Sequence, residues 1–167
     1  MAQQVKPIKR SKELVPLSKD HHDGLLLCWK IRQGLKNKVD TERIVAYVLC
    51  FYENDLATHF EQEEELVFSL LAADDPMKLE AIKQHRTLNG IYKSLKHQAG
   101  NTEEKLLLNQ FEQELNGHIR FEERELFPYI EKMSDPDQFR IAGKQIADLH
   151  QGHECLVWKD EFWATKI

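Results

Sequence analysis

Two segments of the chain repeat a pattern of histidine and glutamate that could bind metal ions. The segment HFEQEEELVF, which starts at His59, recurs 59 residues later as HIRFEERELF, which starts at His118. Each copy places a glutamate, Glu63 or Glu122, four residues after its histidine, so on a helix the two side chains share one face. Two such pairs on facing helices would converge on one interior point. Helical bundles build sites for two metal ions in this way.

The apolar surroundings of these pairs favour a metal as the source of compensating charge. His59 follows Leu56 by three residues and His118 follows Leu115 by three, so the helical period directs both histidines inward. A buried glutamate without a partner is strongly destabilising, and a divalent or trivalent cation would compensate its charge. Imidazole nitrogen and carboxylate oxygen suit iron, manganese or zinc better than calcium or magnesium.

Histidines in two other segments could complete such a site. His85 lies three residues before Leu88 on an apolar helix face. His21 and His22 are adjacent and project about 100° apart on a helix, so we expect only one of them to bind metal. His22 is favoured, because Leu25 follows it at the interval at which Leu88 follows His85. His21 stays an alternative, and would otherwise support the site from its rim.

Helix start and stop signals divide the chain into five helical segments. Asp-Pro pairs at residues 75–76 and 135–136 each offer an N-cap followed by proline at the first helical position. Asn101 and Glu104 form a capping box, and Pro128 should kink its helix or loosen one turn of it. No segment alternates with the period of a strand. We expect helices at about 18–36, 41–70, 76–97, 101–132 and 135–163.

These segments predict an all-α fold, an up-down-up-down four-helix bundle with an additional C-terminal helix. We expect a partly mobile lead-in over residues 1–13 and one bundle domain over 14–163, with its core at 14–132 and the extra helix at 135–163. A length of 167 residues suits a single domain with a real core. Glu64 and Glu123 belong to a solvated face in this fold, although their recurrence in both repeats would let them orient a ligand.

The composition narrows the class of protein. Hydrophobic residues make up 41% of the chain and charged residues 31%, as in a soluble globular protein. The net charge of −5 argues against nucleic acid or an anionic membrane as a partner, and no apolar run is long enough to span a bilayer. Three widely spaced cysteines, and no signal-type apolar segment, predict free thiols in the cytoplasm.

Together these motifs resemble the hemerythrin-like (HHE cation-binding) family over about residues 14–132. The resemblance rests on an early Asp-His-His, on H-x-x-x-E from His59, on Gln-His at 84–85, and on H-x-x-x-E-E-x-x-L-F-P from His118. It implies a four-helix bundle around a non-haem di-iron centre, for which manganese or zinc could substitute. By position, it implies His22 and His59 on one iron, His85 and His118 on the other, and Glu63 and Glu122 as bridges.

The chain departs from the oxygen-carrying members of this family at two positions. Asn89 stands where those proteins have a second histidine on the third helix, and Glu122 stands in place of an aspartate that lies one residue further along. The resemblance then implies a nearly symmetric centre, with two histidines per metal and more open coordination positions. Glu125 or His153 could fill a vacancy, but a solvent-facing Glu125 and a His153 that satisfies a core contact are favoured.

Three functions fit this sequence. The first is a di-iron protein that binds or senses O2 or iron, a ligand-binding protein rather than a classical enzyme. The alternative is a redox-active di-iron protein of the iron–sulfur-cluster-repair type, which responds to nitric oxide or peroxide. In the third, a metal only stabilises a partner-binding bundle. The expected partner is a small ligand such as O2, NO or peroxide, with a redox or protein partner that the sequence does not identify.

Overall fold

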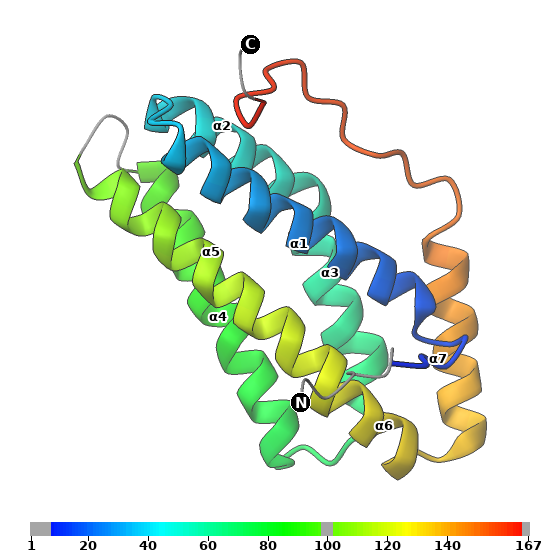
Figure 1. Ribbon diagram of the computed structural model, residues 1–167. Coiled ribbons are helices and arrows are strands. Elements are labelled where there is room, and N and C mark those ends of the chain that lie inside the picture. Colours follow the sequence, from blue (N-terminus) through cyan, green and yellow to red (C-terminus); the bar gives the residue numbers. More distant parts are fainter. Residues whose placement is uncertain (1–7, 98–101, 165–167) are drawn as a thin grey trace, which may run out of the picture.

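Four helical rods lie side by side and alternate in direction (Figure 1). The computed structural model describes residues 8–97 and 102–164, and every regular element within them is helical. Short connections join the first rod to the second and the second to the third, as in an up-down-up-down bundle. The all-α bundle expected from the sequence is therefore confirmed. Within the described ranges, no helix combines the length and apolarity needed to cross a membrane.

Two of the rods are single helices and two are built from several helical segments in line. The first rod is α1 (Val15–Lys36) and the third is α4 (Pro76–His97). The second consists of α2 (Thr41–Phe51), the π-helical η1 (Tyr52–Leu56), α3 (Ala57–Gln62), the π-helical η2 (Glu63–Val67) and the short η3 (Phe68–Leu70). The fourth consists of α5 (Glu103–Phe121), the π-helical η4 (Glu122–Leu126) and α6 (Phe127–Met133). The additional helix, α7 (Pro136–Leu149), packs beside η2 and α1.

Aspartate caps start two of the helices as the sequence predicts. Asp75 Oδ1 accepts the backbone N–H groups of Met77 and Lys78 at 2.9 and 3.3 Å, and Asp135 caps α7 in the same way. α1 begins at Val15, before the expected Ser18, because a proline fits the first turn of a helix without losing a hydrogen bond. The proposed capping box includes Asn101, which lies outside the described residues.

The C-terminal helix is shorter than expected. α7 ends at Leu149, and residues 150–164 run back along the bundle without helix, towards α2 (Figure 1). Gly152 adopts a φ of 77°, a left-handed conformation that does not continue a helix. Phe162 is buried, and its ring centroid lies 5.7 Å from that of Tyr47 in α2. The prediction of helix over 150–163 is therefore wrong, because this segment packs as an irregular strap that buries Phe162 and partly buries Trp158 and Trp163.

Two apolar clusters fill the bundle, one above and one below a polar layer. One cluster includes Leu27 and Leu88, and the other includes Leu17 and Ala81. Each rod carries a buried histidine or glutamate between members of the two clusters, as His85 lies between Ala81 and Leu88. Apolar packing on both sides keeps this layer out of water, so its charges need partners inside the protein.

Candidate metal centre

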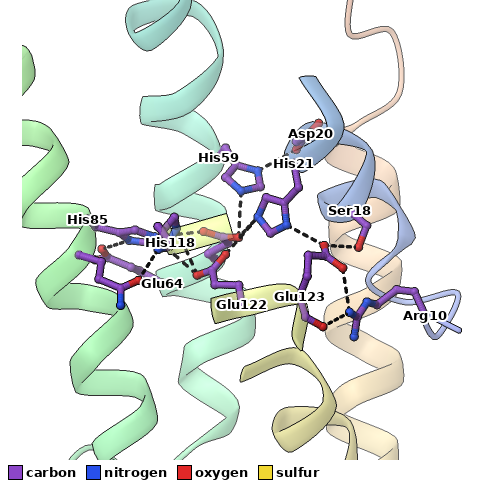
Figure 2. Close-up of polar contacts among 12 residues, drawn as sticks. Arg10, Ser18, Asp20, His21, His59, Glu64, His85, His118, Glu122 and Glu123 are labelled. Atoms are coloured by element: carbon purple, nitrogen blue, oxygen red, sulfur yellow. Dashed lines mark hydrogen bonds and ion pairs between the residues drawn. The ribbon is translucent and has the colours of Figure 1, made fainter. Parts of the chain in front are cut away.

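Six polar side chains from all four rods meet in the buried layer. Each is at most 5% exposed, although histidine and glutamate are rarely buried so completely. Figure 2 shows the imidazoles of α1, α3, α4 and α5 turned toward the carboxylates in the middle of the bundle. The six residues are His21 (α1), His59 (α3), Glu63 (η2), His85 (α4), His118 (α5) and Glu122 (η4).

These side chains divide into two groups that share both glutamates. Within each group, the four possible ligand atoms lie within 4.8 Å of one another. Position A is the group with His21 and His59, and position B is the group with His85 and His118. The structure places His85 and His118 in one group and His59 in the other, the grouping that the sequence predicted for the metal ligands. The fourth histidine is His21.

Glu63 directs one oxygen to each position. Its Oε1 lies 3.2 Å from Nε2 of His21 and 2.9 Å from Nε2 of His59, both in position A. Its Oε2 lies 3.2 Å from Nε2 of His85 in position B. A carboxylate with this placement can bridge two cations.

Glu122 has the matching arrangement from the opposite rod. Its Oε2 lies 3.1 Å from Nε2 of His21, and its Oε1 lies 3.4 Å from Nε2 of His118. Each position therefore receives two imidazole nitrogens and one oxygen from each glutamate. The arrangement has an approximate twofold symmetry that relates the second rod to the fourth and the first to the third.

Several of these buried atoms have no hydrogen-bond partner. Oppositely charged groups lie close to these atoms, but none in the described ranges forms a hydrogen bond with them. The atoms are Nε2 of three histidines and three carboxylate oxygens: His59 Nε2, His85 Nε2, His118 Nε2, Glu63 Oε2 and both oxygens of Glu122. Buried polar atoms in native proteins are almost always satisfied, so this concentration at one point calls for a missing partner. A set of imidazole nitrogens and carboxylate oxygens fits iron, manganese or zinc. The residues present therefore fit a pair of such cations.

The outward nitrogen of every clustered histidine meets a side-chain oxygen. Nδ1 of His21 lies 2.7 Å from Glu123, that of His59 2.9 Å from Asp20, that of His85 2.7 Å from Glu64, and that of His118 2.9 Å from Gln84. Because each Nδ1–H donates a hydrogen bond to this oxygen, the neutral form of each imidazole presents its Nε2 lone pair to the interior. Carboxylate or amide behind histidine is the usual support of a metal ligand.

Comparison with known protein families agrees with this geometry. The model of the hemerythrin HHE cation-binding domain matches residues 17–130, which contain all six clustered side chains. The chain belongs to this family. Comparison with curated proteins and with solved structures finds no match. The HHE domain thus accounts for the cation-binding bundle, whereas Arg10, α7 and the strap lie outside the matched residues.

Glu63 and Glu122 of the HHE domain each stand at the start of a π turn. The N–H of Phe68 donates to the carbonyl of Glu63, and the N–H of Phe127 donates to that of Glu122, five residues back in each case. Such turns insert one residue into a helix and often occur at functional sites. Pro128 follows the second turn, as expected for a loosened helix. The first turn has no proline after it, so proline is not required for the shape.

The placement of His22 corrects the sequence analysis. His22 is exposed, whereas His21 is 3% exposed and faces the glutamates. The inward face of α1 follows Leu17, His21 and Gly24, at spacings of four and three residues. Leu25 does not correspond to Leu88, because Leu25 is only partly buried, at the edge of the apolar face, whereas Leu88 is fully buried.

Three other candidates of the sequence analysis lie away from the centre. Asn89 accepts a hydrogen bond from Tyr52 at 3.3 Å. Glu125 is exposed, and His153 is 49% exposed and pairs with Asp55 at 2.9 Å. The structure therefore brings neither Glu125 nor His153 to a vacancy at the centre.

Two residues of the sequence motifs support histidines of the HHE domain, a role that the sequence did not predict. Asp20 and Gln84 each precede a clustered histidine, yet each hydrogen-bonds the histidine of a different helix. Glu64 and Glu123 follow the glutamates, and the sequence placed them on a solvated face with an orienting role as the alternative. Each hydrogen-bonds a clustered histidine, which fits the alternative. The recurrence of a polar residue just before the histidines of α1 and α4 is the signal that could have identified Asp20 and Gln84.

Burial and neighbouring carboxylates act against each other on the histidines. Burial disfavours a charged imidazole, but the carboxylates in contact outweigh it at three of the four. The pKa of His59 and of His85 rises to about 9, and the pKa of His21 rises well above its usual value. His118 is the exception, because burial and then the neighbouring His85 hold its pKa well below the usual value.

The pKa values of the two clustered glutamates of the HHE domain are shifted in opposite directions. Burial and the charge of Glu63 raise the pKa of Glu122 to about 7. Burial also acts to raise the pKa of Glu63, but His59 and the other histidines around it outweigh burial and hold that pKa well below its usual value. Protons are therefore shared among the imidazoles and carboxylates, and a cation that binds here would displace them.

Proposed function

We propose that this HHE domain holds two iron ions and uses the centre to bind or sense O2 or iron. The observation that carries the proposal is that Glu63 and Glu122 each direct one oxygen to position A and one to position B. Two carboxylates shared in this way provide for two cations held close together. Manganese and zinc accept the same donors and are possible substitutes.

The number of protein ligands supports a role in binding a small molecule. Each position offers four protein atoms, which leaves coordination positions free on an ion that accepts more than four. A bound iron pair would supply redox and Lewis-acid chemistry at those free positions. The residues around it hold the imidazoles in one tautomer and exclude water with the apolar clusters above and below.

The alternative is a redox-active centre that responds to nitric oxide or peroxide, as in iron–sulfur-cluster repair. The specific feature in its favour is the equal share of histidines, two per position. Asn89, where oxygen carriers have a further histidine, lies against Tyr52 and leaves position B with two. A centre that is open at both metals suits turnover as well as reversible binding.

Anaerobic iron reconstitution followed by exposure to a ligand tests these proposals. We expect two irons per chain by metal analysis. A visible band that appears under O2 and reverses on its removal supports the binding or sensing role, and steady consumption of peroxide or nitric oxide supports the alternative. A folded protein that takes up no metal, and whose melting temperature does not change when iron is added, would show that both proposals are wrong.

A further inference from the structure

The approximate symmetry of the centre does not extend to the side chains that contact the outward nitrogens of its histidines. In position A, the outward nitrogens of His21 and His59 meet the carboxylates of Glu123 and Asp20. In position B, His85 meets the carboxylate of Glu64, but His118 meets the neutral amide of Gln84. The two positions therefore have the same inner donors and different outer charges.

The outer carboxylates of position A are themselves held in place. Glu123 receives a hydrogen bond from Ser18 at 2.6 Å and an ion pair from Arg10 at 2.8 Å, and the Arg10 side chain is only 6% exposed (Figure 2). Asp20 lies 2.8 Å from Nε2 of His150, which caps the C-terminal end of α7. Two lines of contacts thus fix the ring planes in position A.

Two of these supports, Arg10 and His150, come from segments that flank the family match. Arg10 precedes the matched residues 17–130 and His150 follows them. The line from His59 through Asp20 to His150 joins α3, α1 and the end of α7. The additional helix therefore contributes a positioning residue to one metal position, besides its packing.

The outer supports of position B are weaker. The side chain of Glu64 is 42% exposed, and among the described residues it shows no polar contact besides His85. Gln84 donates from Nε2 to Glu80 at 2.9 Å, which fixes its amide so that Oε1 faces His118. The nearest carboxylate in the line of contacts behind His118 is therefore that of Glu80, reached through Gln84, whereas the other three histidines contact a carboxylate directly.

We propose that position A binds its ion more tightly than position B, so that the centre fills in order and position B is the exchangeable one. The inference rests on the proposed function, because it concerns the same two metals. A carboxylate behind a histidine raises its basicity and fixes its orientation, and loss of such a partner typically costs about 10–100-fold in metal affinity. Position B lacks one such partner and holds the other at the surface.

A swap of two side chains on α4 tests the cause. The double variant Glu80→Gln, Gln84→Glu keeps the net charge and lets the new amide donate to the new carboxylate, four residues apart. It places a carboxylate behind His118 while its matched control, Glu80→Gln alone, does not. In the metal-free protein titrated anaerobically with Co2+ against a competing chelator, we expect two binding phases, and the swap should tighten the second about tenfold.

Variants with one position removed assign the phases. His118→Ala leaves position A and His21→Ala leaves position B, and we expect the first to bind Co2+ at least about tenfold more tightly than the second. His150→Ala should weaken only the tighter phase of the parent protein. The helical circular dichroism signal shows whether each variant is folded. If a histidine variant unfolds, the swap variant, which keeps all four histidines, still tests whether the second binding phase depends on the residue behind His118.

Each outcome has one reading. A parent protein that binds two ions in a single phase, together with a swap that behaves like Glu80→Gln, would overturn the inference and leave the proposed function standing. Equal or tighter binding at position B would also overturn it. A parent protein that binds no Co2+ or Fe2+ would overturn both.

Discussion

Glu63 Oε1 lies 2.9 Å from Nε2 of His59, one helical turn before it in the chain. The other oxygen of Glu63 lies 3.2 Å from Nε2 of His85, on a different rod. The same side chain therefore takes part in the local histidine–glutamate pair that the sequence repeats and in a contact across the bundle. Its removal should affect both metal positions.

Replacement of Glu63 by alanine should abolish the binding of both ions together, because each position loses one of its two carboxylate oxygens. Iron per chain after anaerobic reconstitution measures the effect. Glu61→Ala is the matched control, since Glu61 is exposed on the same rod, and it should retain both irons. Retention of one tightly bound iron in the Glu63 variant would contradict a shared bridge.

The two neighbouring histidines of α1 should behave very differently. His21→Ala removes a buried imidazole from position A and should lower the metal content by at least one ion per chain. His22→Ala alters an exposed side chain and should leave the metal content unchanged. It should change the free energy of unfolding by no more than about 0.5 kcal/mol. Metal analysis and urea unfolding of the two variants provide the measurement. Equal losses in both would show that α1 presents a different face.

The metal-free protein should lose stability as the pH rises from about 6.5 to about 9. The pKa values of His59 and His85 are raised from 6.5 to about 9 in the folded state, so the stabilisation from their charged forms is complete below 6.5 and lost as the pH passes 9. The raised pKa of Glu122, about 7, acts in the same direction from about 4.5 to 7. Urea unfolding at a series of pH values measures the trend.

Metal should reverse this dependence on pH. Histidine must be neutral and glutamate charged to bind a cation, so the apparent affinity for Co2+ should rise over the same pH range, with release of protons. Competition titrations at pH 6.5 and 8.5 measure the change. A metal-free protein that gains stability toward pH 9 would be inconsistent with the charge distribution described for the centre.

Substitution of a glycine in α1 tests whether the C-terminal strap packs against that helix. A Cβ at Gly34 would lie 2.8 Å from Cδ1 of Ile44 and 2.9 Å from Cδ2 of Phe162, so Gly34→Ala should lower the free energy of unfolding by about 1–3 kcal/mol. The control is Gly117→Ala, where a Cβ would meet nothing within 4 Å, and it should raise that free energy by about 0.5–1 kcal/mol. If both substitutions stabilise, the strap does not pack on α1 as described.

The sequence by itself determined the parts of this protein that depend on contacts within one helix. The spacing of four residues placed His59 with Glu63 and His118 with Glu122, because such residues share a helix face whatever packs against it. Asp75 set the start of α4 by accepting hydrogen bonds from the backbone N–H groups of the second and third residues after it, Met77 and Lys78.

Only the tertiary structure decided which of His21 and His22 faces the centre, because their directions differ by about 100° and the rotation of α1 depends on its packing against other helices. It also decided the outer partners, since Asp20 and Gln84 reach histidines on other rods. The strap after Leu149 is likewise set by burial of Phe162 against distant residues. Contacts between segments far apart in the chain leave no fixed spacing in the sequence, and the folded bundle alone brings them together.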